Sequence, residues 1–335
     1  MKRWRIVFLG LALLILLAGL AFAFQSHLNQ WRTLASLQKV DDYPLFVMTY
    51  YGDYGFKDFL QEGVQTNARS KTNSRETGEW GCTVFAALNE NGSLVLGRNL
   101  DWHNHAALLL YTDPPDGYAS ASLIDVFYLG YDAWRDTWQS RQELLEAPYW
   151  PFDGMNEMGL AVGMMAVPYT GLSQDPEKVT IGSLQAIRLM LDYAGDVDEA
   201  IALLQNYNLV FRGGPAVHYL IADAAGNSAV IEFVGGEMVV LRPDEPWQVS
   251  TNFVISREQP EGADTSCWRY NRSYETLAQT KGSISPAEAM NLLENVSQDS
   301  TMWSVVYGME TGDIQIALDR NYGEVREFKL EVVGD

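Results

Sequence analysis

This chain is poor in cysteine, in histidine and in positive charge, and each shortage excludes a class of protein. A chain of 335 residues with two cysteines, Cys82 and Cys267, cannot be a disulfide scaffold. The sequence does not decide whether these two cysteines form a single disulfide bond. Its four histidines show neither a His-Glu-x-x-His motif nor zinc-ligand spacing, so we predict no metal or cofactor site. The net charge of −20 argues against nucleic-acid and polyanionic partners, which would need a basic face.

Internal repeats, low-complexity tracts and Pro/Ser-rich linkers are also absent from the sequence. Hydrophobic residues make up 47% of the chain, which is enough for a sizeable core. One compact domain of about 250 residues is therefore the simplest organisation, since large sandwiches reach that size. The sequence leaves a homo-oligomeric state open.

The first residues have the pattern of an export segment. Lys2, Arg3 and Arg5 precede an unbroken apolar stretch over residues 6–24. A signal peptide cleaved after Ala23 and an uncleaved membrane anchor both fit residues 1–24, because the stretch is about long enough to span a bilayer. Both alternatives place the body outside the cytoplasmic membrane, and membrane contact is expected only through this segment.

Residues 25–81 form a distinct region between this segment and the body. An aromatic-rich stretch covers residues 43–56, and a run rich in Asn, Ser, Thr, Arg and Lys covers residues 65–79. The polar run predicts an exposed, flexible loop. It ends abruptly at Trp80-Gly81-Cys82.

From Cys82 onward the pattern is that of short strands in hairpins with a few amphipathic helices. Strands are predicted over residues 82–88, 93–99, 122–128, 159–167, 217–222, 228–233, 238–241, 247–252, 302–307, 314–318 and 325–330. Helices are predicted over residues 181–193, 197–206 and 286–296, with Asp196 and Ser285 as N-caps and Pro286 in a first turn. This mixture favours an α+β class of stacked antiparallel sheets with helices outside.

Cys82 opens the first predicted strand of the body, directly after the polar run. If the bond between Gly81 and Cys82 is cut, Cys82 carries a thiol and a free α-amine. An α-amine has a pKa of about 8, so it can act as general base toward its own thiol, and no histidine is needed. Gly81 has no Cβ, and we expect this to permit the backbone geometry in which the thiol attacks the preceding carbonyl.

Arg98 and Asp101 are the next candidates, because a hairpin through residues 89–92 would fold their strand back beside Cys82. A carboxylate there would hold the new amine, and an arginine would favour the thiolate. A plain strand-end ion pair is the alternative interpretation of the same two residues.

Five motifs in order make the chain resemble the choloylglycine hydrolase family, which includes bile salt hydrolases and penicillin V acylases. The resemblance spans residues 82 to about 330. It is carried by Cys82-Thr83 with Gly97-Arg98-Asn99-Leu100-Asp101-Trp102, by Asp153-Gly154-Met155-Asn156-Glu157-Met158-Gly159-Leu160, by Ser250-Thr251-Asn252, by Trp268-Arg269-Tyr270-Asn271-Arg272 and by Thr301-Met302-Trp303-Ser304-Val305-Val306-Tyr307.

The resemblance implies a four-layer αββα sandwich, the N-terminal-nucleophile hydrolase fold, and hydrolysis of linear amides. It implies that Cys82 is nucleophile and base, that Arg98 and Asp101 set its charge state, and that Arg269 completes the charged site. It further implies that Asn252 donates to the oxyanion. Such a donor is worth about 3 kcal/mol of barrier.

The chain departs from the family in two places. Ala166 stands where bile salt hydrolases have an oxyanion-hole asparagine, which puts bile-salt specificity in doubt; Met164 and Ala166 are expected to contact substrate. The N-terminal region is long and resembles the propeptides of self-cleaving members. We therefore expect residues 25–81 to be removed or nicked at Gly81–Cys82, leaving residues 82–335 as the hydrolase domain.

The expected partner is a small N-acyl amide, with penicillin V, N-acyl amino acids, acyl-homoserine lactones and conjugated bile acids left open. Two rival interpretations also remain. A papain-type peptidase would need a histidine bonded to Cys82, for which His218 is the candidate. A membrane-anchored binding module without enzymatic activity would use the aromatic stretch 43–56 as its contact surface.

Overall fold

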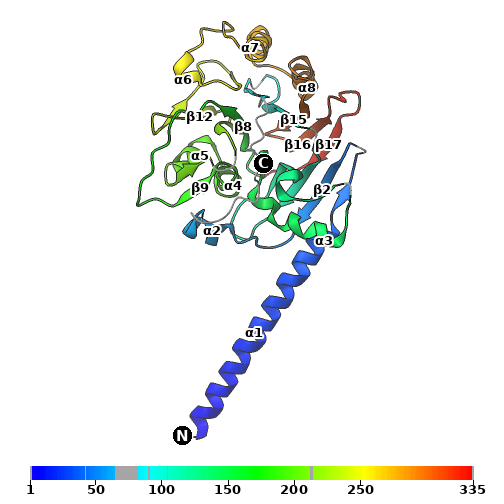
Figure 1. The fold of residues 1–335 in the computed structure, drawn as a ribbon, viewed down its shortest axis with the longest axis vertical. Coiled ribbons are helices and arrows are strands. Elements are labelled where there is room, and N and C mark those ends of the chain that lie inside the picture. Colours follow the sequence, from blue (N-terminus) through cyan, green and yellow to red (C-terminus); the bar gives the residue numbers. More distant parts are fainter. Residues whose placement is uncertain are drawn as a thin grey trace.

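The computed structural model describes residues 2–41, 43–64, 81–89, 91–103, 105–133, 135–211 and 214–333. The polar run for which we predict an exposed loop lies outside the described residues. The first helix, α1, runs from Lys2 to Ala35 and projects from the body in Figure 1. A search of the described residues finds no helix with the length and hydropathy of a membrane span.

Along the rest of the chain, runs of successive strands are separated by groups of helices. The remaining helices are α2 (Phe56–Glu62), α3 (Trp138–Arg141), α4 (Ser183–Tyr193), α5 (Val197–Leu204), α6 (Ile255–Glu258), α7 (Trp268–Thr280) and α8 (Pro286–Asn295), with 3₁₀ helices η1 (Val126–Leu129) and η2 (Gln142–Tyr149). The strands are β1 (Gln38–Lys39), β2 (Leu45–Tyr50), β3 (Gly81–Ala87), β4 (Val95–Asp101), β5 (Ala107–Thr112), β6 (Ser120–Asp125), β7 (Asp153–Asn156), β8 (Ala161–Val167), β9 (Thr180–Gly182), β10 (Asn208–Val210), β11 (Ala216–Ala222), β12 (Ser228–Val234), β13 (Glu237–Leu241), β14 (Trp247–Ser250), β15 (Thr301–Gly308), β16 (Asp313–Leu318) and β17 (Arg326–Lys329).

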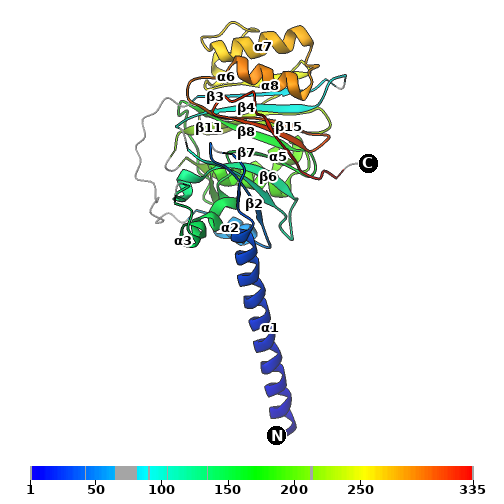
Figure 2. The same cartoon turned by 90° about the vertical axis from the view of Figure 1, so that its right-hand side faces the viewer.

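Two large sheets stack face to face between helices, as Figure 2 shows. One sheet has the strand order β1-β2-β5-β6-β7-β8-β11-β12-β13, and the other has the order β14-β3-β4-β15-β16-β17. Helices α7 and α8 pack on the second sheet, while α4 and α5 pack on the first, and β3 contacts β8 between the sheets. The predicted αββα sandwich is confirmed.

Local signals in the sequence place most of these elements correctly. Asp196 accepts a hydrogen bond from Glu199 N at the start of α5. Ser285 and Glu288 form a capping box at the start of α8, where Pro286 occupies the first turn. These caps satisfy backbone N–H groups that have no partner inside a helix, so α5 and α8 begin directly after their predicted caps.

Several predicted boundaries are wrong for identifiable reasons. The strand predicted over 122–128 stops at Asp125, whose side chain caps η1 by accepting from Phe127 N. The helix predicted from 181 begins at Ser183, because residues 180–182 form β9 and pair with β10. The strand predicted to 252 ends at Ser250, which leaves Asn252 in an irregular segment.

The N-terminal region is built into the body, which the sequence did not predict. Strand β2 pairs in parallel with β5, from Leu45 opposite Ala107 to Tyr50 opposite Thr112. Beyond it, the Tyr54 hydroxyl donates to Asp192 over 2.7 Å. The aromatic stretch is therefore core: Phe46, Met48, Tyr50, Tyr54 and Phe56 are all buried. This finding removes the basis for the binding-module interpretation, which needs these side chains exposed.

Candidate active site

The β3–β4 hairpin brings Cys82 beside Arg98 and Asp101, as its turn signal predicts. Gly81 lies opposite Asp101 and Cys82 lies opposite Leu100 in the antiparallel register. Cys82 is 2% exposed, and both cysteines are free, so the disulfide left open by the sequence is not formed. Gly81 lacks the positive φ seen at other glycines, so the expected strained geometry is not what requires it.

Close packing requires a glycine at position 81 instead. An added Cβ would lie 2.8 Å from the Asp101 Oδ2 atom and would collide with the Gln298 side chain. The residue before the predicted cleavage site is thus pressed against a carboxylate. Asp101 itself is fixed by hydrogen bonds from Gln298 and Thr301.

Arg98 lies fully buried beneath Cys82. Its Nη1 donates to the carbonyl oxygen of Phe152 over 2.6 Å and forms an ion pair with Asp153. Its Nε and Nη2 atoms have no hydrogen-bond partner among the described residues. Burial raises the pKa of the Cys82 thiol, whereas the positive charge of Arg98 acts in the opposite direction. Burial therefore opposes ionisation of this thiol.

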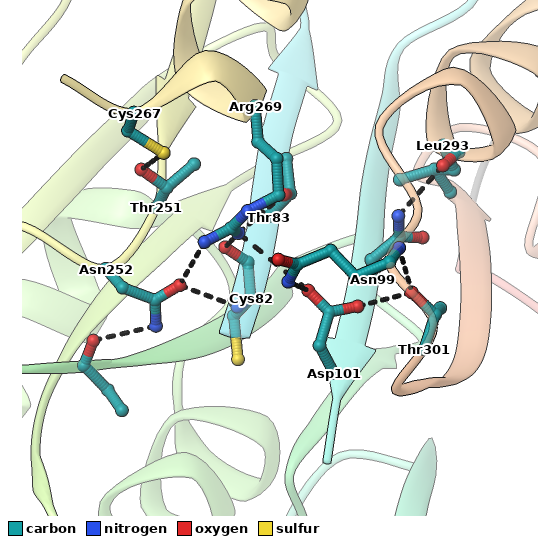
Figure 3. A network of polar contacts seen from close by, with 12 residues as sticks. Cys82, Thr83, Asn99, Asp101, Thr251, Asn252, Cys267, Arg269, Leu293 and Thr301 are labelled. Atoms are coloured by element: carbon teal, nitrogen blue, oxygen red, sulfur yellow. Dashed lines mark hydrogen bonds and ion pairs between the residues drawn. The ribbon is translucent and has the colours of Figure 1, made fainter. Parts of the chain in front are cut away.

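Asn252 and Arg269 close the site from the other side (Figure 3). The backbone N–H of Cys82 donates to Asn252 Oδ1 over 2.7 Å, and Arg269 Nη2 donates to the same oxygen over 2.9 Å. Arg269 Nη1 also donates to the Cys82 carbonyl oxygen and to Thr83 Oγ1. These contacts grip the backbone on which the new amine would form, while the thiol points away from them.

The predicted oxyanion role of Asn252 is not seen in the uncut chain. Its Nδ2 atom donates to the carbonyl oxygen of Ala166 over 2.8 Å, so both ends of the amide are occupied. Asn252 would have to release that carbonyl before donating to an oxyanion. The role therefore stays a prediction.

A cavity of about 740 Å³ opens onto the thiol, and Cys82, Arg98, Met164 and Ala166 line it. Most of the other lining side chains are aromatic or aliphatic, and five lining residues come from the N-terminal region: Gln30, Tyr50, Tyr54, Phe59 and Val64. Two acidic side chains, Glu143 and Glu146, also line it. The chamber fits an apolar group placed next to the sulfur.

His218 does not serve Cys82, which removes the geometric basis for the papain-type interpretation. Its Nδ1 faces Glu232 Oε1 at 3.2 Å, and its Nε2 faces the Thr251 carbonyl oxygen at 2.8 Å. Among the described contacts, neither ring nitrogen is bonded to Cys82. A papain-type base needs that bond.

The sequence analysis missed the groups that hold the charged side chains in place. Asp153 accepts from Trp303 Nε1 over 3.1 Å and from the Tyr307 hydroxyl, in addition to Arg98. The side chains of Thr301 and Gln298 hold Asp101 in place by donating hydrogen bonds to its carboxylate. Asp153, Trp303 and Tyr307 all stand within the motifs that carry the family resemblance, so a signal was present, but nothing in the sequence pairs them.

Comparison with known proteins agrees with this geometry. Residues 151–322, just over half of the chain, match the family of acyl-coenzyme A:6-aminopenicillanic acid acyl-transferase. An uncharacterized protein of Paramecium bursaria Chlorella virus 1 is 30% identical over 120 residues, which cover 33% of this chain and 42% of that protein. The chain thus spans less than half of the length of this relative.

Two solved structures share the fold. A mutant conjugated bile acid hydrolase from Clostridium perfringens is 16% identical with a TM-score of 0.53, covering 74% of this chain and 92% of its own. Penicillin V acylase from Agrobacterium tumefaciens is 17% identical with a TM-score of 0.51, covering 74% and 91%. The kinship predicted from the motifs is confirmed, and the chain belongs to the acyl-coenzyme A:6-aminopenicillanic acid acyl-transferase family, with the N-terminal-nucleophile hydrolase fold.

Proposed function

We propose that this protein is a self-cleaving cysteine amidase that hydrolyses linear N-acyl amides. The observation that carries the proposal is the position of Cys82. Its thiol faces an apolar cavity, and its backbone N–H is held by Asn252. Arg98, Asp101 and Arg269 surround it with charge. The amide hydrolases that share the fold support the reaction class.

Maturation would begin with attack of the Cys82 thiol on the Gly81 carbonyl carbon. The peptide C–N bond breaks as the thioester forms, and the proton of the thiol passes to the nitrogen, which becomes the free α-amine. Water then hydrolyses the thioester and leaves Gly81 with a carboxylate. The Asp101 side chain packs against Gly81, so it stands next to the reacting carbonyl.

Turnover would repeat this chemistry on substrate. The α-amine of Cys82 takes the thiol proton as sulfur attacks the amide carbonyl, and it later protonates the departing amine. The thioester is then hydrolysed by water. Because burial raises the pKa of the thiol, the sulfur needs a nearby base to become nucleophilic near neutral pH, and the α-amine of the same residue is that base.

The cavity favours an uncharged, apolar acyl group. Among the described residues that line it, Arg98 is the sole cation and already pairs with Asp153, whereas Glu143 and Glu146 add negative charge. An anionic acyl group would meet these carboxylates in a partly desolvated space. We therefore rank penicillin V and long-chain N-acyl amino acids, whose acyl groups are uncharged, as better substrates than amides with charged acyl groups.

Cleavage would nick the chain without releasing the N-terminal part. Residues up to 64 contribute strand β2 to the first sheet and five residues to the cavity wall. Val64 N also donates to the Thr180 carbonyl oxygen over 2.8 Å. The mature enzyme would then be two non-covalently joined fragments of one chain.

The test is the intact mass and N-terminal sequence of the purified full chain, compared between wild type, Cys82→Ala and Cys267→Ala. We expect a fragment beginning Cys-Thr-Val-Phe from wild type and from Cys267→Ala, which controls for loss of a thiol. Cys82→Ala should stay whole. Equal processing of Cys82→Ala would contradict the mechanism.

Activity is then measured as acid and amine released from penicillin V and from N-acyl amino acids of increasing chain length. The family's name adds a second candidate reaction, transfer of the acyl group to an amine. Both reactions share the thioester on Cys82. Adding 6-aminopenicillanic acid to the assay with N-acyl amino acids separates them, since transfer to this amine yields a new amide and hydrolysis yields free acid.

We also propose that the N-terminal segment directs export, because Lys2, Arg3 and Arg5 precede its apolar stretch. Expression with a reporter at the C-terminus, followed by cell fractionation, tests this proposal. Recovery of the uncut Cys82→Ala chain beginning at Phe24 in the extracytoplasmic fraction would identify a cleaved signal. Recovery in the cytosol would contradict export.

A further inference from the structure

His218 and Glu232 form a buried pair that the reaction described above does not use. His218 lies on β11 and is 1% exposed, and Glu232 lies on the neighbouring strand β12 and is also 1% exposed. Burying a histidine and a carboxylate costs free energy unless their polar atoms are satisfied. Their partners therefore indicate what the pair is for.

All of those partners outside the pair belong to one short segment, residues 250–256, which we call the Asn252 segment. The Nε2 atom of His218 lies 2.8 Å from the Thr251 carbonyl oxygen and 3.2 Å from Ser250 Oγ. A carbonyl oxygen can only accept, so Nε2 donates to it. The ring thus pins the peptide bond between Thr251 and Asn252.

Glu232 holds the other end of the same segment. Its Oε1 accepts from Ile255 N over 2.7 Å, and its Oε2 accepts from Ser256 N over 3.0 Å. Both are backbone N–H groups of the first turn of α6, which has no side-chain cap of its own. Burial would raise the pKa of Glu232, but hydrogen bonds with His218 and Ser256 outweigh it and keep this pKa below its usual value. The carboxylate is therefore the ionised acceptor that this turn needs.

Asn252 stands between the two anchored ends. Strand β14 stops at Ser250 and α6 starts at Ile255, so residues 251–253 lie in neither a strand nor a helix. Yet Asn252 must place its Oδ1 atom 2.7 Å from Cys82 N and 2.9 Å from Arg269 Nη2. Some other contact has to supply the required precision.

We propose that His218 and Glu232 are positioning residues that clamp the Asn252 segment and thereby hold the Cys82 amine in its reactive place. The proposal rests on the proposed function for its catalytic consequence. Its structural consequence, an immobile Asn252 segment, does not depend on any activity. The pair acts through Asn252 and touches neither the thiol nor the cavity.

The test compares His218→Gln with His105→Gln. His105 is a matched control, because its Nδ1 contacts Asp125 Oδ2 at 2.8 Å in a histidine–carboxylate pair outside the Asn252 segment. We expect His218→Gln to lower the self-cleavage rate and kcat by about tenfold to a hundredfold, with KM within about twofold, since a shift of about 1 Å in a catalytic group has that effect. His105→Gln should match wild type in both.

Backbone amide exchange, followed by mass spectrometry, supplies a readout that does not need activity. Peptides covering residues 250–256 should exchange about tenfold faster in His218→Gln than in wild type and His105→Gln, because a clamped segment has lost an anchor. Wild-type exchange together with wild-type kcat in His218→Gln would overturn the proposal. A wild-type chain that neither cuts itself nor hydrolyses amides would refute the proposed function, while the exchange comparison would still decide the clamp.

Glu232→Gln provides a second variant in case His218→Gln fails to fold. It keeps the size and one oxygen acceptor, but it replaces the other acceptor with an NH₂ group that faces a donor. We expect faster exchange centred on residues 255–256 and a smaller loss of kcat. Unchanged exchange in a folded Glu232→Gln protein would overturn the proposal by itself.

Discussion

Arg98 and Arg188 are both fully buried, yet their surroundings differ in one respect. This difference distinguishes an arginine that stabilises the fold from one that is available to the reaction. Each is paired with an aspartate, Asp153 for Arg98 and Asp192 for Arg188. Burial alone would lower the pKa of each guanidinium, but the neighbouring acidic groups raise it above its usual value. Both side chains are therefore permanent buried cations.

The difference lies in how many donors are already used. Every nitrogen of Arg188 has a partner: Nε donates to the Pro148 carbonyl oxygen, Nη1 to Thr112, Ser120 and Asp192, and Nη2 to Ser122. Among the described residues only Nη1 of Arg98 has hydrogen-bond partners, whereas its Nε and Nη2 have none, and Arg98 lines the cavity together with Cys82. A saturated arginine holds a fold together, whereas unused donors next to a thiol are available to a reacting group.

The largest expected effect is on the saturated arginine. Asp192→Ala leaves Arg188 buried without its counter-ion, and an arginine cannot lose its charge, so the free energy of unfolding should fall by about 3–5 kcal/mol. Urea denaturation measures this change. The double variant Arg188→Met/Asp192→Leu should lose less, because it removes both charges. An Asp192→Ala protein as stable as wild type would show that the two arginines do not differ as argued.

Arg98→Met tests the other side of the comparison. Self-cleavage and kcat should fall by about 10²- to 10³-fold, the usual effect of removing one well-placed donor from a reacting centre. Stability should change less than in Asp192→Ala, since Asp153 keeps its bonds from Trp303 and Tyr307 and, unlike an arginine, can take up a proton. Single-turnover rates and urea denaturation on the same protein separate the two effects.

A matched pair of tyrosine variants sharpens the contrast further. Tyr307→Phe removes a hydroxyl that donates to Asp153, and Tyr54→Phe removes one that donates to Asp192. Each should cost about 1–3 kcal/mol of stability, because a buried carboxylate loses a donor. Only Tyr307→Phe should also lower the rate of self-cleavage, by about tenfold, since Arg98 is held through Asp153. Equal self-cleavage rates for the two variants would contradict this assignment.

Ser122→Ala is expected to have the smallest effect. The substitution removes the Ser122 hydroxyl, which accepts a hydrogen bond from Arg188 Nη2 over 3.1 Å. The other nitrogens of Arg188 keep their hydrogen-bond acceptors. The loss of stability should be about 1 kcal/mol, with kcat and KM unchanged. Thermal unfolding and steady-state kinetics measure both. If the fall in kcat, expressed as a free energy, exceeded the fall in the free energy of unfolding, Arg188 would take part in the reaction.

The sequence could predict what is local. The β3–β4 hairpin follows from an Asn-Gly turn between β-prone runs, so the approach of Arg98 and Asp101 to Cys82 was predictable from spacing. Helix starts were predictable because Asp196 and Ser285 cap their own backbone. In each case the decisive contact joins residues fewer than about 20 positions apart, where chain geometry leaves few alternatives.

Long-range choices could not be predicted in the same way. Strand β2 pairs in parallel with β5, which lies across the predicted cleavage site, and no turn signal records that pairing. Asp153 stands 55 positions from Arg98, one acidic residue among 43 in the chain. The orientation of the Asn252 amide depends on Ala166, Cys82 and Arg269 together, which are brought together only by the finished fold.

The parallel pairing of β2 with β5 has a consequence for how this protein can be produced. A chain starting at Cys82 would expose β5 as the edge of its sheet, with the unpaired backbone of a Leu-rich strand open to other copies. Such an edge is a template for intermolecular pairing. In a chain cut after Gly81, the N-terminal part would have to lie in the sheet already if β2 is to cover this edge.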